Sequence, residues 1–239
     1  MNCGAMAKII RYDSARDVDV EFEDGYISKN KSYYSFKNGE IANPKHPTVC
    51  GVGYLDDAIT KDEFGKMLCS YRIWHSMLSR CYNEKNHNYK KYGAKGVTVC
   101  DEWKSYANFK KWFNLNYYVM PNGEKVNLDK DIMCENNNEY SPNACMFVPS
   151  TINSLFTPRR RDRALPRGVA KKGNKYTARI MKDKKEYCLG TFDSKLEAHT
   201  CYMKHYRSHL LEVAERYKEY IPNKLYNRLI YLGNEEMLD

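Results

Sequence analysis

The most regular alternation of apolar and polar residues lies in the last third of the chain. Three short alternating segments are separated by Gly173-Asn174 and by Asp183-Lys184, pairs of residues that suit tight hairpin turns. A segment with helical spacing of apolar residues follows, and Ser194 opens a capping box at its start. The pattern predicts a three-stranded antiparallel sheet covered by one helix.

The middle segment, residues 175–182, predicts a strand with two different faces. Tyr176, Ala178 and Ile180 occupy alternate positions and are expected to be buried. Arg179 lies on the opposite face, where it would meet solvent or a ligand. The strand is therefore expected to bury one face and to present a basic one.

The first sixty residues are expected to form a separate β-rich domain. Residues Asp17 to Phe22 alternate strictly, Gly25 marks a turn, and the segment from Tyr33 to Phe36 resumes the pattern. This domain would form a small barrel that either packs against the rest of the chain or contacts a protein partner.

Residues 61–118 have the spacing of two amphipathic helices around a glycine-rich turn and a short strand over 97–100. The apolar positions of the first helix are Phe64, Met67, Leu68, Tyr71, Trp74, Leu78 and Cys81. Those of the second helix are Trp103, Tyr106, Phe109 and Phe113. Both stripes are expected to form a core.

A hairpin and a short helix are predicted next, with strands at 126–131 and 144–148 and a helix at 149–157. This order would bring the end of the first strand beside the first turn of the helix. Asp129 and Asn153 would then direct oxygen atoms into one small volume. Two oxygen ligands with water and phosphate suit Mg²⁺ or Mn²⁺.

Positive charge is concentrated near the predicted sheet. Residues 158–207 contain fifteen Lys or Arg and five Asp or Glu, a net charge of +10, whereas the whole chain is +9 and residues 1–60 are −2. Basic and aromatic side chains interleave along the strands, which favours binding of nucleic acid over general solubility. Arg159, Arg160 and Arg161 would form a basic bridge able to follow a phosphate backbone.

The nine cysteines include no CxxC pair, which indicates reduced thiols in a cytoplasmic protein. Zinc ligands usually occur in closely spaced pairs, so zinc is the less favoured metal. The alternative zinc site would use Cys81, Cys100, Cys134 and Cys145. The sequence has no apolar run long enough for a membrane span and no signal-peptide pattern at its start.

The basic segment resembles the Apetala/ethylene-response-factor type of DNA-binding domain over about fifty residues. The matching residues are Arg167-Gly168-Val169, Tyr176, Ala178, Ile180, Leu189-Gly190, Phe192, Glu197-Ala198 and Tyr202. The resemblance implies a sheet that lies in the major groove of duplex DNA. It implies DNA-facing roles for Arg167, Lys171, Lys172, Lys175, Arg179, Lys182 and Lys184, with Tyr176 and Tyr187 where plant members carry Trp.

A second resemblance, over about ninety residues, is to the phage type of HNH (ββα-metal) endonucleases. It is carried by WxxMLxRCY from Trp74, YGxxGVxVCxxW from Tyr92 and YSPxxCxFVPxxIN from Tyr140. It implies metal binding by Asp129 and Asn153, with Asn143 as the middle asparagine of the motif. Both resemblances imply a phage or prophage protein in the cytoplasm of a bacterial host.

The chain departs from the HNH pattern at the general base, where Lys130 replaces histidine. An exposed lysine beside two carboxylates keeps its proton, so it would contact phosphate rather than activate water. Asp131 or His75 would have to act as a substitute base. Two functions follow: a metal-dependent endonuclease targeted by its C-terminal domain, or a non-catalytic DNA-binding, regulatory or interference protein.

The predicted fold class is α+β with three domains. These are a β-rich domain over 1–60, an HNH-like ββα module over 61–157 and an Apetala-type domain with C-terminal helices over 158–239.

Overall fold

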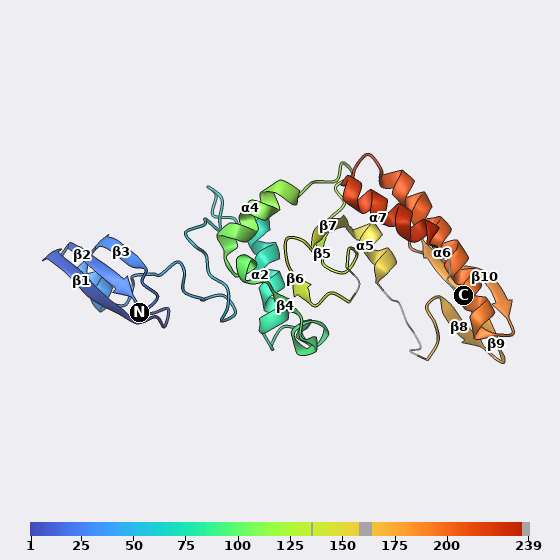
Figure 1. Ribbon diagram of the computed structural model, residues 1–239, viewed down its shortest axis with the longest axis horizontal. Helices are drawn as coiled ribbons and strands as arrows, with labels where there is room; N and C mark the ends of the chain where they lie inside the picture. The colour runs from blue at the N-terminus through green and yellow to red at the C-terminus, as the bar shows by residue number, and fades with distance from the viewer. Residues whose placement is uncertain (135, 158–163, 236–239) are drawn as a thin grey trace. The chain divides into compact units, whose positions relative to one another are not determined.

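The computed structural model describes residues 1–134, 136–157 and 164–235, and the chain is a mixed α and β protein, as predicted (Figure 1). It forms two compact units. The first consists of Met1–Tyr117 and Asn136–Cys145, and the second of Tyr118–Glu135 and Met146–Asp239. These units divide the chain differently from the three predicted domains, whose boundaries stay a prediction.

The first unit begins with a small antiparallel sheet. Strands β1 (Ala7–Ser14), β2 (Asp17–Phe22) and β3 (Ile27–Lys31) lie in that order, and β2 has the predicted bounds. Alternate residues of β2 form a core with residues that precede and follow the sheet in the chain. The three strands form an open sheet rather than the predicted barrel. The buried members are Ala5, Val18, Val20, Phe22 and Ile41.

The predicted second strand of this domain is wrong. Residues Tyr33–Lys37 form helix α1 instead. The Oγ atom of Ser32 accepts the N–H of Ser35 at 3.0 Å and caps the helix start, a local bond that competes with a strand.

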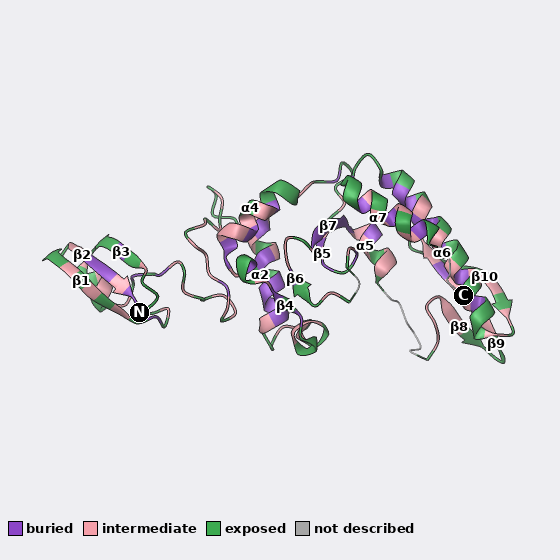
Figure 2. Cartoon of the chain, viewed as in Figure 1, coloured by how far each residue is buried: buried purple, intermediate pink, exposed green. Residues whose placement is uncertain are grey.

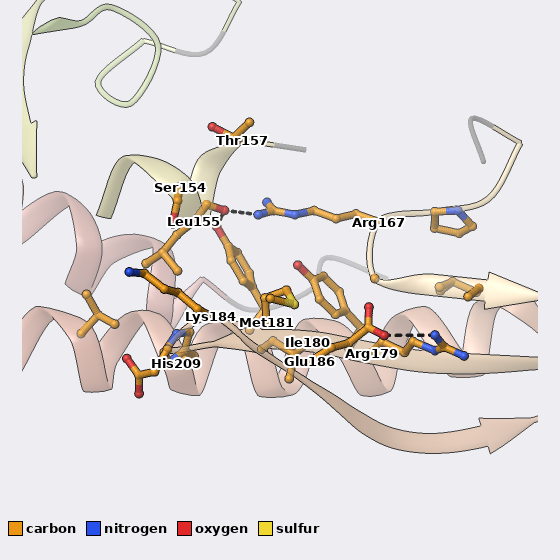
Figure 3. A pocket seen from close by; sticks show the side chains of 18 of the residues that line it. Ser154, Leu155, Thr157, Arg167, Arg179, Ile180, Met181, Lys184, Glu186 and His209 are labelled. Atoms are coloured by element: carbon orange, nitrogen blue, oxygen red, sulfur yellow. Dashed lines mark hydrogen bonds and ion pairs between the residues drawn. The ribbon is translucent and has the colours of Figure 1, made fainter. Parts of the chain in front are cut away.

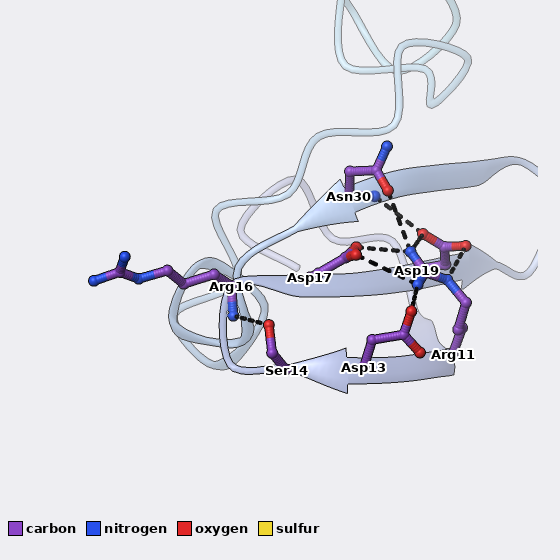
Figure 4. Close-up of polar contacts among 7 residues, drawn as sticks. All are labelled: Arg11, Asp13, Ser14, Arg16, Asp17, Asp19 and Asn30. Carbon is purple, nitrogen blue, oxygen red and sulfur yellow. Dashed lines mark hydrogen bonds and ion pairs between the residues drawn. The ribbon is translucent and has the colours of Figure 1, made fainter.

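The polar face of the same sheet is organised around Arg11 (Figure 4). Its guanidinium lies 2.8 Å from Asp19 and 2.7 Å from Asp17, and it also contacts Asp13 and Asn30. The hydrogen bond from Arg11 lowers the pKa of Asp19 to about 2. These contacts join β1 to β2 and β3 on this face.

Helix α2 (Cys69–Tyr82) begins later than the apolar spacing predicted. Phe64 is 86% exposed and Met67 49%, so neither belongs to the core stripe. The cause is a turn in which Asp62 Oδ1 accepts the N–H groups of Phe64 and Lys66 at 3.0 and 2.8 Å.

The aromatic core of the first unit confirms the second predicted stripe. Helices α3 (Asp101–Lys104) and α4 (Tyr106–Asn116) divide it at Ser105, whose hydroxyl caps α4. Trp74, Trp103, Tyr106 and Phe109 are fully buried and Phe113 nearly so. Strand β4 (Thr98–Val99) pairs in parallel with β6 (Glu139–Tyr140) at its side.

The second unit contains the predicted hairpin and helix. Strand β5 (Val126–Asp129) pairs antiparallel with β7 (Met146–Pro149), and helix α5 (Ser150–Phe156) follows directly. We call these elements the ββα element. Val126, Leu128 and Ile152 are buried in it. Figure 2 colours the chain by burial and shows buried residues along β7.

The predicted C-terminal sheet and helix are confirmed in the same unit. Strands β8 (Val169–Lys172), β9 (Lys175–Lys182) and β10 (Lys185–Phe192) form an antiparallel sheet in the order β10-β9-β8. Helix α6 (Lys195–Tyr217) covers one face, and α7 (Asn223–Asn234) packs on α6. Among the described residues no helix is both long and apolar enough to span a membrane.

The two hairpin turns of this sheet differ in backbone conformation. Gly173 has a positive φ of 61°, but Asn174 is not among the residues with positive φ. Asp183 and Lys184 have φ values of 48° and 65°, as both central residues of a type I′ turn require.

Gly168, directly before β8, lies close against Tyr202 of α6. Its φ is +76°, and a Cβ atom there would lie 2.0 Å from the ring of Tyr202. No L-residue fits without moving Tyr202, which is 5% exposed.

We predict that Gly168→Ala is far more destabilising than Gly173→Ala. Gly173 also has a left-handed φ, of +61°, but nothing lies within 4 Å of an added Cβ. Both substitutions cost about 1–2 kcal/mol for the backbone conformation. Only Gly168→Ala adds the overlap with Tyr202, roughly 1–3 kcal/mol more. Urea unfolding of the two variants measures the difference, and equal midpoints would contradict it.

Candidate functional site

The face of the C-terminal sheet opposite α6 carries Arg179, as the alternation predicted, and two lysines beside it. Lys172 pairs with Lys175 across the β8–β9 hairpin, so both lie on the same face as Arg179. Lys172 and Lys175 are exposed, and the Arg179 side chain is 34% exposed. We call this face the outer face of the sheet.

Two acidic side chains hold these cations in place on the outer face. Arg179 Nη1 lies 3.1 Å from Glu186, and Lys175 Nζ lies 2.9 Å from Asp193. Both ion pairs are exposed to water and are therefore weak. They orient the side chains and can be exchanged for contacts with another anion.

The other predicted DNA-binding residues of the strands lie on the side that faces α6. Lys171 pairs with Tyr176, and Tyr187 pairs with Ile180, whose side chain is buried against the helix. Lys182 lies on this side too, with its Nζ 2.9 Å from Glu212 Oε2 of α6.

Arg167 is used inside the unit rather than on the outer face. Its guanidinium donates to the carbonyl of Leu155 in α5 and lies 4.3 Å from the ring centroid of Tyr206 in α6. Tyr206 donates its hydroxyl to the same carbonyl at 3.2 Å. Arg167 therefore joins α5 to α6.

A groove of about 1380 Å³ lies beside this contact, between α5, α6 and the β8–β9 edge (Figure 3). Ser154 and Leu155 line one side, and Ile180, Met181 and His209 line the other. Lys184, from the hairpin turn, is exposed and also lines the groove. The predicted basic bridge, Arg159 to Arg161, lies outside the described residues.

The register of the ββα element corrects the expected metal site. Ser150, the first residue of α5, bonds through its N–H to the carbonyl of Lys125 at 2.9 Å, and Asn127 donates to its hydroxyl at 2.9 Å. In an antiparallel pair the second strand ends beside the start of the first. The first helical turn therefore lies beside the start of β5, not beside Asp129.

Asp129 forms a turn of its own at the strand end. Its Oδ1 accepts the N–H groups of Asp131 and Ile132, both at 2.8 Å. Burial raises the pKa of Asp129. Lys130, expected to be exposed, is only 6% exposed, with its Nζ 2.5 Å from Asp131 Oδ1.

The remaining predicted site residues are divided between the units. Asn153 is half-buried on α5 in the second unit, whereas Asn143 and His75 are exposed residues of the first. Of the four cysteines in the alternative zinc site, Cys134 alone belongs to the second unit. In the described part of the chain no three His, Cys, Asp or Glu side chains gather as metal ligands.

These contacts do not fit a Mg²⁺ or Mn²⁺ ion at Asp129. One carboxylate oxygen already accepts two amides, and the ammonium of Lys130 is buried at the adjacent position. The one other oxygen ligand predicted, Asn153, lies on a helix that begins at the far end of the strand.

Residues that the sequence analysis missed join the ββα element to the C-terminal helices. Glu124 accepts the N–H of Thr151 at 2.6 Å and the hydroxyl of Tyr217 at 2.7 Å. Arg228 of α7 donates to the carbonyl of Ile132 at 2.8 Å. The bonded residues are up to 96 positions apart, so no local pattern indicates them.

Comparison with known proteins found no family model, curated protein or solved structure that matches the chain. The two resemblances rest on the residues quoted for them, and the functions they imply are proposals.

We predict that Glu124 contributes to the free energy of unfolding of the second unit above pH 4.5, and that this contribution decreases at lower pH. Burial alone would raise the pKa of Glu124, but the bonds from Thr151 and Tyr217 outweigh it and lower the pKa below 4.5. Because the folded pKa is depressed, the stabilisation is present above the unfolded pKa and disappears as the pH falls through the folded one.

Glu124→Gln should therefore cost about 1–3 kcal/mol at pH 7 and clearly less at pH 3. Tyr217→Phe removes one hydrogen bond and no charge, so it serves as the matched control with a smaller cost at pH 7. Denaturant unfolding at both pH values measures this. A cost of Glu124→Gln that does not change with pH would contradict the role of the carboxylate.

Proposed function

We propose that the protein binds duplex DNA through the outer face of its C-terminal sheet. The observation that carries the proposal is the division of the basic residues in β8 and β9. Lys172, Lys175 and Arg179 share the outer face, whereas the opposite face is packed on α6. A rigid basic strand face is a suitable element for a DNA groove.

The centre of the outer face is formed by small residues. Ala170, Thr177 and Thr191 pair across its centre, so three small side chains lie side by side on neighbouring strands. Thr177 and Thr191 hydroxyls lie 3.5 Å apart. The cations beside these residues would then reach phosphates, with Arg179 placed to reach a base edge.

The contacts of the ββα element favour a binding role over hydrolysis. Asp129 is engaged by backbone amides, and Lys130 is buried beside Asp131. Glu124 and Arg228 instead attach this element to the helices behind the sheet. On this proposal the HNH-like hairpin supports a DNA-binding unit and does not cut its ligand.

We predict that Arg179→Ala weakens duplex binding by roughly 1–3 kcal/mol if the guanidinium reads a base edge. Lys182→Ala is the matched control, because Lys182 lies three residues away on the opposite face and contacts Glu212. It should change DNA affinity little. Titration of labelled duplex DNA at several salt concentrations measures both variants.

Equal loss by the two variants would show that charge alone matters, and a larger loss for Lys182→Ala would place the DNA on the other face. Stronger binding to duplex RNA of the same sequence would reject DNA as the ligand.

We also predict that the native chain nicks plasmid with Mg²⁺ or Mn²⁺ no faster than Asp129→Ala. Lys130→His places histidine in the position of the HNH base and tests whether lysine alone silences the centre. We expect no gain, because position 130 is buried. Metal-dependent nicking by the native chain that Asp129→Ala abolishes would establish the nuclease function instead.

A further inference from the structure

A second basic surface lies in the first unit, on the loop of residues 83–96. Residues 61–118 contain eleven Lys or Arg and five Asp or Glu, a net charge of +6. The net charge of the whole chain does not reveal this basic segment, because the segments on either side of it have a negative net charge. The loop carries four lysines against one acid, Glu84, and all four are exposed: Lys85, Lys90, Lys91 and Lys95.

The backbone of this loop is held by buried contacts. The guanidinium carbon of Arg80 lies 5.1 and 5.0 Å from the ring centroids of Tyr92 and Tyr140, which are themselves stacked 6.4 Å apart. A Cβ atom on Gly93 would lie 2.1 Å from the carbonyl oxygen of Cys81, so the loop is pressed against the end of α2. The lysines therefore project from a fixed frame.

Side-chain hydrogen bonds close both ends of the loop. Asn86 donates to the hydroxyl of Ser79 at 2.8 Å, and the hydroxyl of Tyr82 accepts the N–H of Val99 at 2.9 Å. Two short 3₁₀ helices, Tyr89–Lys91 and Gly93–Lys95, shape the chain between them. Lys90, Lys91 and Lys95 lie on these helices.

Holding like charges together on a fixed loop costs electrostatic energy, which a polyanion relieves. Lysine ammonium groups contact phosphates without reading bases. The loop has one exposed acidic side chain, Glu84, beside its four exposed lysines, and it has no arginine. This excess of positive charge matches a phosphate backbone better than a protein surface of mixed charge.

We propose that the lysines of loop 83–96 form a second, sequence-independent contact with the phosphate backbone of the duplex that the sheet binds. This inference rests on the proposed function. Two linked contacts on one ligand raise the overall affinity well above that of either, provided that the duplex is long enough to reach both.

The test uses the full chain and a variant in which the four loop lysines are replaced by Gln. Its matched control replaces four exposed lysines of the N-terminal sheet domain: Lys29, Lys31, Lys37 and Lys45. Both variants lose the same charge. Affinity is measured against salt concentration on a short duplex and on one about twice as long, after thermal melts confirm folding.

For the long duplex, the loop variant should lower the slope of log affinity against log salt by about 2–4, since each lost phosphate contact removes about 0.9. It should lose roughly a hundredfold in affinity there and much less on the short duplex. The control variant should keep the native slope.

Three outcomes would overturn the inference. Equal losses of DNA affinity in both variants would show that only the net charge of the chain matters. A loop variant that binds DNA as tightly as the native chain would reject the loop contact and leave the sheet as the DNA site. Absence of duplex binding by the native chain would reject the proposed function itself, and this inference with it.

Discussion

The two hydrogen bonds accepted by the carboxylate of Glu124 hold the ββα element against the C-terminal helices of the second unit. The carboxylate accepts one bond from the first turn of α5 and another from Tyr217 at the end of α6. Without it, the buried hydroxyl and the helix start would each lose a charged acceptor. Arg167 and Arg228 add two further bonds to backbone carbonyls, so the short ββα element is fixed to the helices that support the sheet.

This attachment explains how basic residues of similar appearance acquire different roles. Arg167 and Lys182 are held by a carbonyl and by a carboxylate within the unit. Lys172, Lys175 and Arg179 remain on the outer face, where the acidic partners present are exposed to water. Arg167 and Lys182 thus stabilise the unit that supports the sheet, whereas the cations of the outer face are available to a ligand.

Alternation between residues 175 and 182 was enough to predict the sheet, its buried face and the position of Arg179, because a strand has a period of two. The start of α2 was predicted too early because the turn at Asp62 depends on side-chain hydrogen bonds. Local patterns also could not indicate that Lys130 is buried, nor that Glu124 meets a residue 93 positions away. Long charged side chains are placed by tertiary contacts.

Lysine footprinting of the native chain tests the central claim most directly, since it reports on each face of the sheet separately. The chain would be acetylated with and without duplex DNA at low salt, and each lysine quantified by mass spectrometry. Our account predicts that DNA protects Lys172 and Lys175, while Lys185, which pairs with Lys182 on the opposite face, stays reactive. Protection of Lys185 with Lys172 and Lys175 unchanged would contradict it.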